Sequence, residues 1–244
     1  MAKVTYLDNA GFIVKTDNVF YVFDYYRDPA HRLVKEMEHN PDLPVVFFAS
    51  SPHTSHYNDQ IFNLAQNHRR VYICANQVVS RIGDTEENVA TLTAGDKIED
   101  VDGTGTTVEA FGSTEAGVSF VVKTADGKTI LFGGDLSPYH LDEGDEKSKA
   151  QAMENKFKTV VDRISELYPT IDLAFLSVDP EATEDYAEGV RYLVEKINVK
   201  NFVPMHYHGK VNEACDFRTY RIPENVTTKF HGFRNVGQEL NIKL

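Results

Sequence analysis

The chain has 244 residues, of which 41% are hydrophobic and 25% are charged, a composition typical of a folded globular protein. Its formal charge of −12, with no run rich in lysine or arginine, argues against nucleic acid or an anionic membrane as a partner. No linker or low-complexity tract divides the chain, so we predict a single domain over residues 1–244.

Cysteine usage and the N-terminal sequence predict a cytoplasmic protein. The two cysteines, Cys74 and Cys215, are far apart and form no CxxC pair, so neither a disulfide framework nor a thiolate zinc site is indicated. The N-terminal stretch lacks the basic, apolar and small-residue blocks of a signal peptide. No apolar stretch approaches the roughly 20 residues that a membrane helix needs.

The first elements are predicted to be an antiparallel set of strands. Residues 3–7, 11–15 and 19–24 alternate apolar and polar side chains and are separated by short polar turns. A helix is predicted over residues 29–38. The continuous apolar run at residues 45–49 then predicts a strand that is buried on both faces.

A parallel pairing is predicted next along the chain. Helical spacing of apolar residues over 59–68, followed by an apolar strand over 71–75, makes a strand–helix–strand unit with the buried strand before it. Short strands separated by glycine and aspartate turns follow, at residues 108–111, 118–124 and 129–132.

The second half of the chain predicts helices alternating with strands. Residues 147–167 have the pattern of a long amphipathic helix. We predict further strands at residues 172–178 and 201–204, a helix at 185–197, and a hairpin in the tail, residues 229–244. Two blocks of strands, each mixed with helices, predict two sheets packed face to face and covered by helices.

Polar side chains follow several of these strands directly. His53 and His56 come after the strand at residues 45–49, Asp135 follows the strand that ends at residue 132, and His206 follows the strand at 201–204. Side chains at one end of a sheet can converge on a common cleft. Histidine and aspartate without cysteine suit a divalent ion such as zinc, iron or manganese.

Each of these residues also has a purely structural explanation. A histidine near a strand end often hydrogen-bonds to the backbone, and Asp135, which follows two glycines, also suits a turn or a helix N-cap. The placement of all four residues after strands is what favours a shared site.

The same residues resemble the motifs of the metallo-β-lactamase fold superfamily of metal-dependent hydrolases. The HxHxDH loop of that superfamily aligns with residues 51–56, its later Gly-Asp with Gly134-Asp135, and its strand-end histidine with His206. The opening segments, VTYLDNAGFIV and VFYVFDYYRDP, resemble its first hairpin and the strand that leads to a buried acidic residue, here Asp24. The resemblance spans about residues 5–209. It implies a four-layer αββα sandwich of α+β or α/β class.

The sequence departs from the superfamily pattern at the metal site. Ser51 and Ser55 stand where the motif has a histidine and an aspartate. The loop that carries a further histidine in the superfamily has the sequence GSTEAG here, in which only Glu115 is a strong ligand. By this resemblance His56, Asp135 and His206 form the most economical ligand set.

The remaining ligand positions are predicted to come from His53, Glu115 or His140. His208 is a weaker candidate because period-two alternation should point it away from His206. Asp135 is the predicted catalytic residue, which would bridge two metals and orient the attacking water.

Two functions follow from this set of residues. The first is a hydrolase in which a metal, zinc first and manganese or iron as alternatives, activates water against an ester, lactone, amide or phosphodiester in a small-molecule substrate. The alternative is a non-catalytic protein of the same fold that has lost or weakened its metal site, holds no metal and binds a small ligand. The serines lie in no GxSxG motif, which argues against a serine hydrolase.

Overall fold

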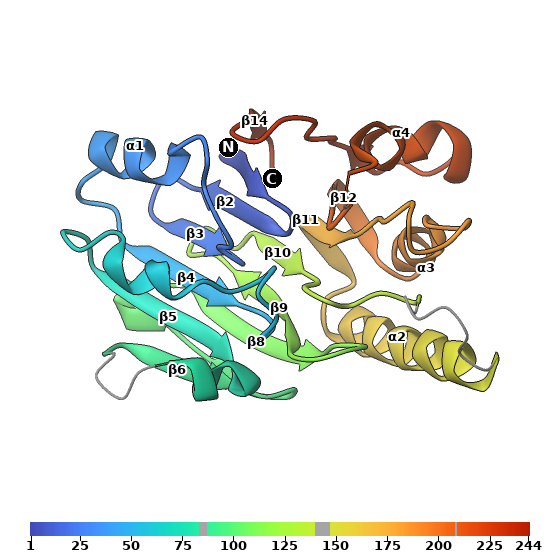
Figure 1. The fold of residues 1–244 in the computed structure, drawn as a ribbon, viewed down its shortest axis with the longest axis horizontal. Helices are drawn as coiled ribbons and strands as arrows, with labels where there is room; N and C mark the ends of the chain where they lie inside the picture. Colours follow the sequence, from blue (N-terminus) through green and yellow to red (C-terminus); the bar gives the residue numbers. More distant parts are fainter. Residues whose placement is uncertain (83–86, 140–146, 208) are drawn as a thin grey trace.

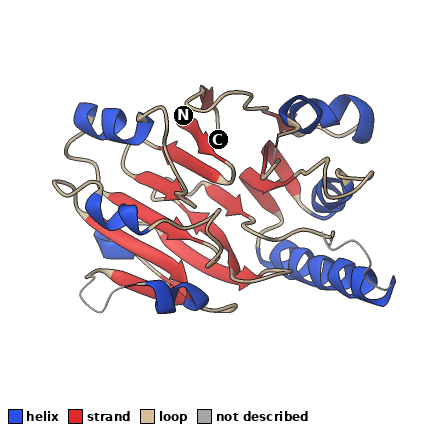
Figure 2. Ribbon diagram, viewed as in Figure 1, coloured by secondary structure: helices blue, strands red, loops and turns tan. Residues whose placement is uncertain are grey.

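Two seven-stranded sheets pack face to face and carry helices on their outer sides (Figures 1 and 2). The structure is a computed structural model that describes residues 1–82, 87–139, 147–207 and 209–244. The predicted αββα sandwich is confirmed.

The first sheet has the strand order β14-β1-β2-β3-β4-β5-β6. Strands β1, β2 and β3 are antiparallel neighbours, as predicted, whereas β3 to β6 run parallel. Their bounds are Ala2–Asp8 (β1), Gly11–Lys15 (β2), Phe20–Phe23 (β3), Val45–Ala49 (β4), Arg70–Ala75 (β5), Val89–Leu92 (β6) and Glu239–Ile242 (β14).

The second sheet has the order β13-β12-β11-β10-β9-β8-β7. Strands β10 to β13 are parallel, and β7 to β10 are antiparallel. Their bounds are Lys97–Ile98 (β7), Thr107–Gly112 (β8), Val118–Lys123 (β9), Thr129–Phe132 (β10), Thr170–Ser177 (β11), Asn198–Met205 (β12) and Lys229–Phe230 (β13).

The α-helices are α1 (Arg32–His39), α2 (Lys147–Leu167), α3 (Glu188–Lys196) and α4 (Val211–Arg221). Helix α2 has the bounds that its amphipathic pattern predicts, and α1 and α3 begin three residues later than predicted. Helix α4 was not predicted from the sequence. Short 3₁₀ helices cover Asp59–Asn63 (η1), Asn76–Arg81 (η2) and Val101–Gly103 (η3). No helix in the described ranges combines the length and the apolar character needed to cross a bilayer.

Two sequence-based predictions are wrong. The helix expected over residues 59–68 is only the 3₁₀ turn η1, because Leu64 is extended and Ala65 is left-handed (φ 53°). The Arg70 guanidinium binds the carbonyl oxygens of Phe62 and Leu64, which a continuing helix would occupy. The parallel pairing of β4 with β5 across this connection is nevertheless confirmed.

The tail hairpin expected over residues 229–244 is also wrong. Strand β13 pairs parallel with β12, whereas β14 pairs antiparallel with β1 in the other sheet. The tail therefore passes from one sheet to the other.

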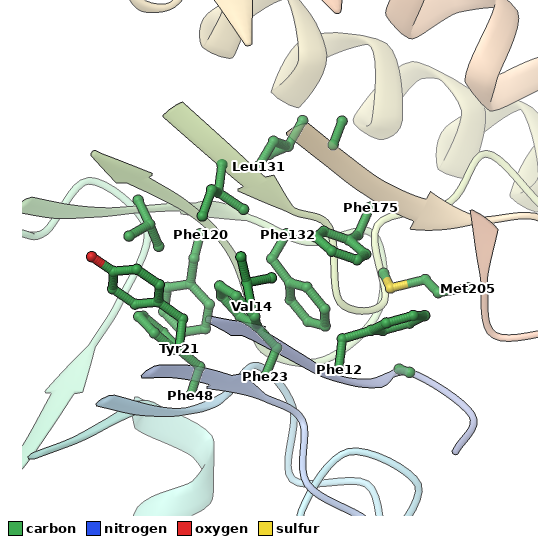
Figure 3. Close-up of a cluster of buried hydrophobic side chains, with 14 of the residues drawn as sticks. Phe12, Val14, Tyr21, Phe23, Phe48, Phe120, Leu131, Phe132, Phe175 and Met205 are labelled. Carbon is green, nitrogen blue, oxygen red and sulfur yellow. The ribbon is translucent and has the colours of Figure 1, made fainter. Parts of the chain in front are cut away.

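Aromatic side chains fill the space between the sheets (Figure 3). Phe12, Phe23 and Phe48 of the first sheet face Phe120, Phe132 and Phe175 of the second. The rings of Phe23 and Phe132 stack with their centroids 4.6 Å apart. Such pairs add about 0.5–1.5 kcal/mol beyond the burial of their area. They hold the two sheets in a register that brings their strand ends together.

Candidate metal site

The candidate site lies at the carboxyl ends of parallel strands from both sheets. Asp24 follows β3, and His53 and His56 lie in the loop after β4. Asp135 comes three residues after β10, and His206 follows β12 directly. The crevice outside the carboxyl ends of parallel strands is where open α/β sheets bind ligands. All four residues that the sequence places after strands therefore reach one region.

Asp24 orients His56. The Asp24 carboxylate is fully buried and accepts hydrogen bonds from Ser50 N (2.7 Å) and Ser50 Oγ (2.6 Å). Its Oδ2 also lies 2.6 Å from His56 Nδ1. With Nδ1 engaged in this way, His56 Nε2 faces Asp135 and lies 2.8 Å from Oδ1. The burial of Asp24, predicted from the resemblance, is confirmed, and its left-handed backbone (φ 43°) is the kind of strain found at functional sites.

The carboxylates of Asp24 and Asp135 stabilise a positive charge on the group that lies between them. Burial lowers the pKa of His56, but Asp24 and Asp135 outweigh this and raise it to about 10. Burial raises the pKa of Asp135, yet His56 and a hydrogen bond from Ser51 bring it down to about 2. Burial also raises the pKa of Asp24, against the hydrogen bonds that it accepts. A proton on His56 or a bound cation can supply the required charge.

His206 lies against His56. The two rings are nearly parallel, with centroids 5.1 Å apart and an interplanar angle of 22°. His206 has a left-handed backbone (φ 60°), and its N–H donates to Asn9 O at 3.3 Å. The Asn9 side chain in turn donates to Ser55 O at 3.2 Å. Asn9 was missed by the sequence reasoning, and the only signal for it is the Asn-Ala-Gly turn between β1 and β2.

Two groups of potential metal ligands share Asp135. Ligand atoms of His56, Asp135 and His206 all lie within 4.8 Å of one another, as do those of His53, Glu115 and Asp135. His53 Nδ1 is 3.2 Å from Asp135 Oδ2. The structure thus brings together five of the residues that the sequence singles out. His140 and His208 lie outside the described residues.

Two atoms at the centre of these groups make no hydrogen bond. Within the described part of the chain, the buried atoms His56 Nε2 and Asp135 Oδ2 have no hydrogen-bond partner, although each faces a nearby nitrogen or oxygen. Buried polar atoms are nearly always bonded, so such an exception calls for an explanation such as an ion. Imidazole and carboxylate donors suit a divalent ion, so these residues fit the metal that the fold implies.

The loop that carries Glu115 is tied to the rest of the site. Thr114 Oγ1 donates to Asp135 O (2.8 Å) and accepts from Ser137 N (2.9 Å). Gly117 is left-handed (φ 87°), and a Cβ there would lie 1.9 Å from Ser50 O. Only glycine permits this approach. Thr114 and Gly117 were not singled out from the sequence.

Two cavities adjoin the ligand groups. The smaller, about 180 Å³, is lined by His53, Glu115, Asp135 and His206, together with Asp179 and Tyr139. The larger, about 510 Å³, is lined by Tyr26 and Tyr207 among others, and Ser55 lines both. Asp179, which comes two residues after β11, lines the smaller cavity and so places the end of that strand at the same edge of the sheet.

Comparison with known proteins identifies the fold. No protein-family model matches the chain, and no curated protein matches it. Among solved structures, a metallo hydrolase from Ignicoccus hospitalis superposes with a TM-score of 0.68 at 15% identity, over 100% of this chain and 99% of the other. The metallo-β-lactamase fold protein YhfI from Bacillus subtilis gives 0.56 at 11% identity, over 99% and 100%. The chain has the metallo-β-lactamase fold.

A protein with a different kind of activity also superposes on this chain. CmlA from Streptomyces venezuelae, a diiron β-hydroxylase, superposes with a TM-score of 0.63 at 10% identity, over 99% of this chain and 54% of that one. At such identities the likeness shows the fold and leaves the reaction to be argued from the site.

Proposed function

We propose that the chain is a metal-dependent hydrolase whose principal metal position is formed by His56, Asp135 and His206. A second, more exposed position is formed by His53, Glu115 and the shared Asp135. The observation that carries the proposal is the convergence of two ligand groups on the shared Asp135, with all ligand atoms of each group within 4.8 Å of one another.

The chain's own residues have distinct roles in this proposal. A divalent metal supplies Lewis acidity and lowers the pKa of a bound water to about 7. Asp24 fixes His56 so that Nε2 points into the site. Asp135 orients the attacking water, and His53, whose side chain is 49% exposed and lies 3.2 Å from Asp135, serves the second metal position.

Zinc is the metal we propose first, because two imidazoles and a carboxylate suit it. Iron and manganese are the alternatives, since the second group has one histidine and two carboxylates, which harder ions tolerate well. The proposed substrate is a small molecule with an ester, lactone, amide or phosphodiester bond, in line with the hydrolase named for the Ignicoccus hospitalis structure. A single domain and a cytoplasmic location remain predictions from the sequence.

An activity screen tests the proposal. The protein is stripped with a chelator, reloaded with zinc, manganese or iron, and assayed on a nitrophenyl ester, a lactone, an anilide and bis-nitrophenyl phosphate. We expect turnover of one substrate class that returns with metal and falls at least about 100-fold in His56→Gln. Stoichiometric metal without turnover of any class would contradict the hydrolase, and the absence of both metal and turnover would favour the non-catalytic alternative.

A further inference from the structure

The larger cavity beside the metal site has the dimensions and lining of a ligand chamber. Its volume is about 510 Å³, within the range of roughly 300–1,000 Å³ typical of small-molecule sites. Tyr6, Tyr26 and Tyr207 line it together with Val211 and Val236. We call it the tyrosine chamber. Its wall offers flat and apolar surfaces to a ring or an acyl chain.

The lining of the tyrosine chamber is less acidic than the chain as a whole. Two arginines, Arg27 and Arg234, and one carboxylate, Asp8, line it, so cationic side chains outnumber anionic ones there in a chain of formal charge −12. The neighbouring metal cavity is lined by three carboxylates, those of Glu115, Asp135 and Asp179, a composition suited to a cation.

Of the two arginines that line the chamber, Arg27 uses fewer of its N–H donors in contacts with other side chains. Its ion pair with Asp8 uses Nε, one of the three nitrogens of the guanidinium. Its side chain is 59% exposed, and the guanidinium lies 5.2 Å from the centre of the Tyr26 ring. Arg234 has fewer donors available for a ligand, because its two terminal nitrogens donate to Asn212 and Asp216.

Ser55 lines both cavities, so they adjoin at this residue. Serine is short and uncharged, so the residue that the two cavities share carries no carboxylate. A ligand that occupied both cavities would pass Ser55.

We propose that the tyrosine chamber binds an anionic, ring-bearing or acyl part of the substrate. A carboxylate or phosphate on that part pairs with Arg27, and its apolar body packs on the tyrosines. This deepens the proposed function, because the bond to be hydrolysed then lies across Ser55 at the metal. Arginine forms bidentate pairs with either anion.

Calorimetric titration of the metal-free protein tests the proposal without relying on the metal. The probes are phenylacetate, phenyl phosphate and benzyl alcohol, which share a ring and differ in charge. We expect both anions to bind wild type at least about 10-fold more tightly than the alcohol, and Arg27→Gln to remove that advantage. The relative affinities of phenylacetate and phenyl phosphate show which anion the chamber prefers.

The matched control is Arg69→Gln. Arg69 pairs with Asp102 at 3.2 Å, and its side chain is 56% exposed, close to the value for Arg27, but it lies outside the chamber. It should leave binding unchanged, whereas Val236→Phe, which fills part of the chamber, should weaken all three probes. Equal binding of alcohol and anions, or equal losses in Arg27→Gln and Arg69→Gln, would overturn the proposal. Since no metal is present, either result leaves the hydrolase proposal to its own test.

Discussion

At the scale of single residues, the site depends on a histidine held between two carboxylates. Asp24 contacts His56 Nδ1 and Asp135 faces Nε2, so a proton and a metal ion compete for the same ring. His56 Nε2 and Asp135 Oδ2 are buried and make ion-pair contacts without a hydrogen bond, an arrangement that suits a bound ion.

Asp24→Asn tests the orienting role of this carboxylate. Asparagine keeps the shape of the side chain and tolerates the left-handed backbone at this position, but it removes the charge that holds His56. We expect the metal dissociation constant to rise about 10–100-fold, measured by competition with a chromophoric chelator.

Asp172→Asn is the matched control for this experiment. Asp172 is also buried and bonded, to Thr129 and Lys200, but it lies near the start of β11, at the opposite end of the sheet from the site. Its replacement should leave metal affinity unchanged. Equal losses in the two variants would mean that Asp24 acts only through general stability.

The pKa values also predict how the stability of the metal-free protein varies with pH. The pKa of His56 is raised from 6.5 to about 10, so its contribution is complete below pH 6.5 and is lost as the pH rises through 10. The pKa of Asp135 is lowered from 3.8 to about 2, so its contribution is complete above pH 3.8 and is lost as the pH falls through 2.

Urea unfolding of the chelator-treated protein should therefore show the free energy of unfolding falling between pH 7 and 10. His56→Gln should flatten this alkaline fall. The control His68→Gln removes a histidine that bonds Leu43 O away from the site, and it should keep the fall. An alkaline slope that persists in His56→Gln would show that other groups cause it.

At the scale of elements, three loops at the strand ends are fastened to one another. Gly117 approaches Ser50 O, and Thr114 bonds Asp135 O and Ser137 N, so the segments after β4, β8 and β10 contact one another directly. The position of Glu115 depends on these contacts and not on its own strand.

Gly117→Ala tests this fastening. The added Cβ would clash with Ser50 O at 1.9 Å and would also strain a φ of 87°, so we expect a loss of at least about 2 kcal/mol in the free energy of unfolding. Gly127→Ala is the control: its φ is 76°, but nothing lies within 4 Å of the new Cβ, and the expected cost is about 1 kcal/mol. Similar costs for the two variants would argue against the close contact.

The elements that the sequence predicts well are those with a complete local pattern. Residues 147–167 have an uninterrupted amphipathic pattern, and α2 has those bounds. Residues 59–68 have helical spacing too, but the bonds from Arg70 to two carbonyls end the helix early, and no local pattern reveals them. The prediction of a hairpin in the tail was wrong for a similar reason, because its two strands pair with strands in different sheets.

In the candidate site, too, the residues predicted from the sequence are those with a local pattern. His53, His56, Asp135 and His206 were predicted as a group because each follows a strand. Contacts between loops that are distant in sequence give Asn9, Thr114 and Gly117 their roles. Periodicity and motif spacing therefore do not predict these three residues.

At the scale of the whole molecule, the site joins the two sheets. Asp24 and His56 follow strands of the first sheet, whereas Asp135 and His206 follow strands of the second. An ion that binds all of its ligands therefore stabilises the packing of one sheet on the other. At 100 times its dissociation constant, a ligand of the folded state adds about 2.7 kcal/mol.

Thermal unfolding should show this coupling. For a chain of this length we expect the metal to raise the Tm by about 5–10 °C, with a clearly smaller rise in His206→Gln, which leaves only the second ligand group intact. His231→Gln serves as the control, because His231 bonds Asn201 within the second sheet. A metal-induced shift that is unchanged in His206→Gln would place the ion elsewhere.

Metal stoichiometry at equilibrium, measured by elemental analysis after dialysis against buffered zinc, tests the central claim most directly. Because Asp135 belongs to both ligand groups and Glu115 to only one, we predict two ions per chain in wild type, one in Glu115→Gln and none in Asp135→Asn. Wild-type protein that retains no ion, or Asp135→Asn that retains as many as wild type, would contradict the account.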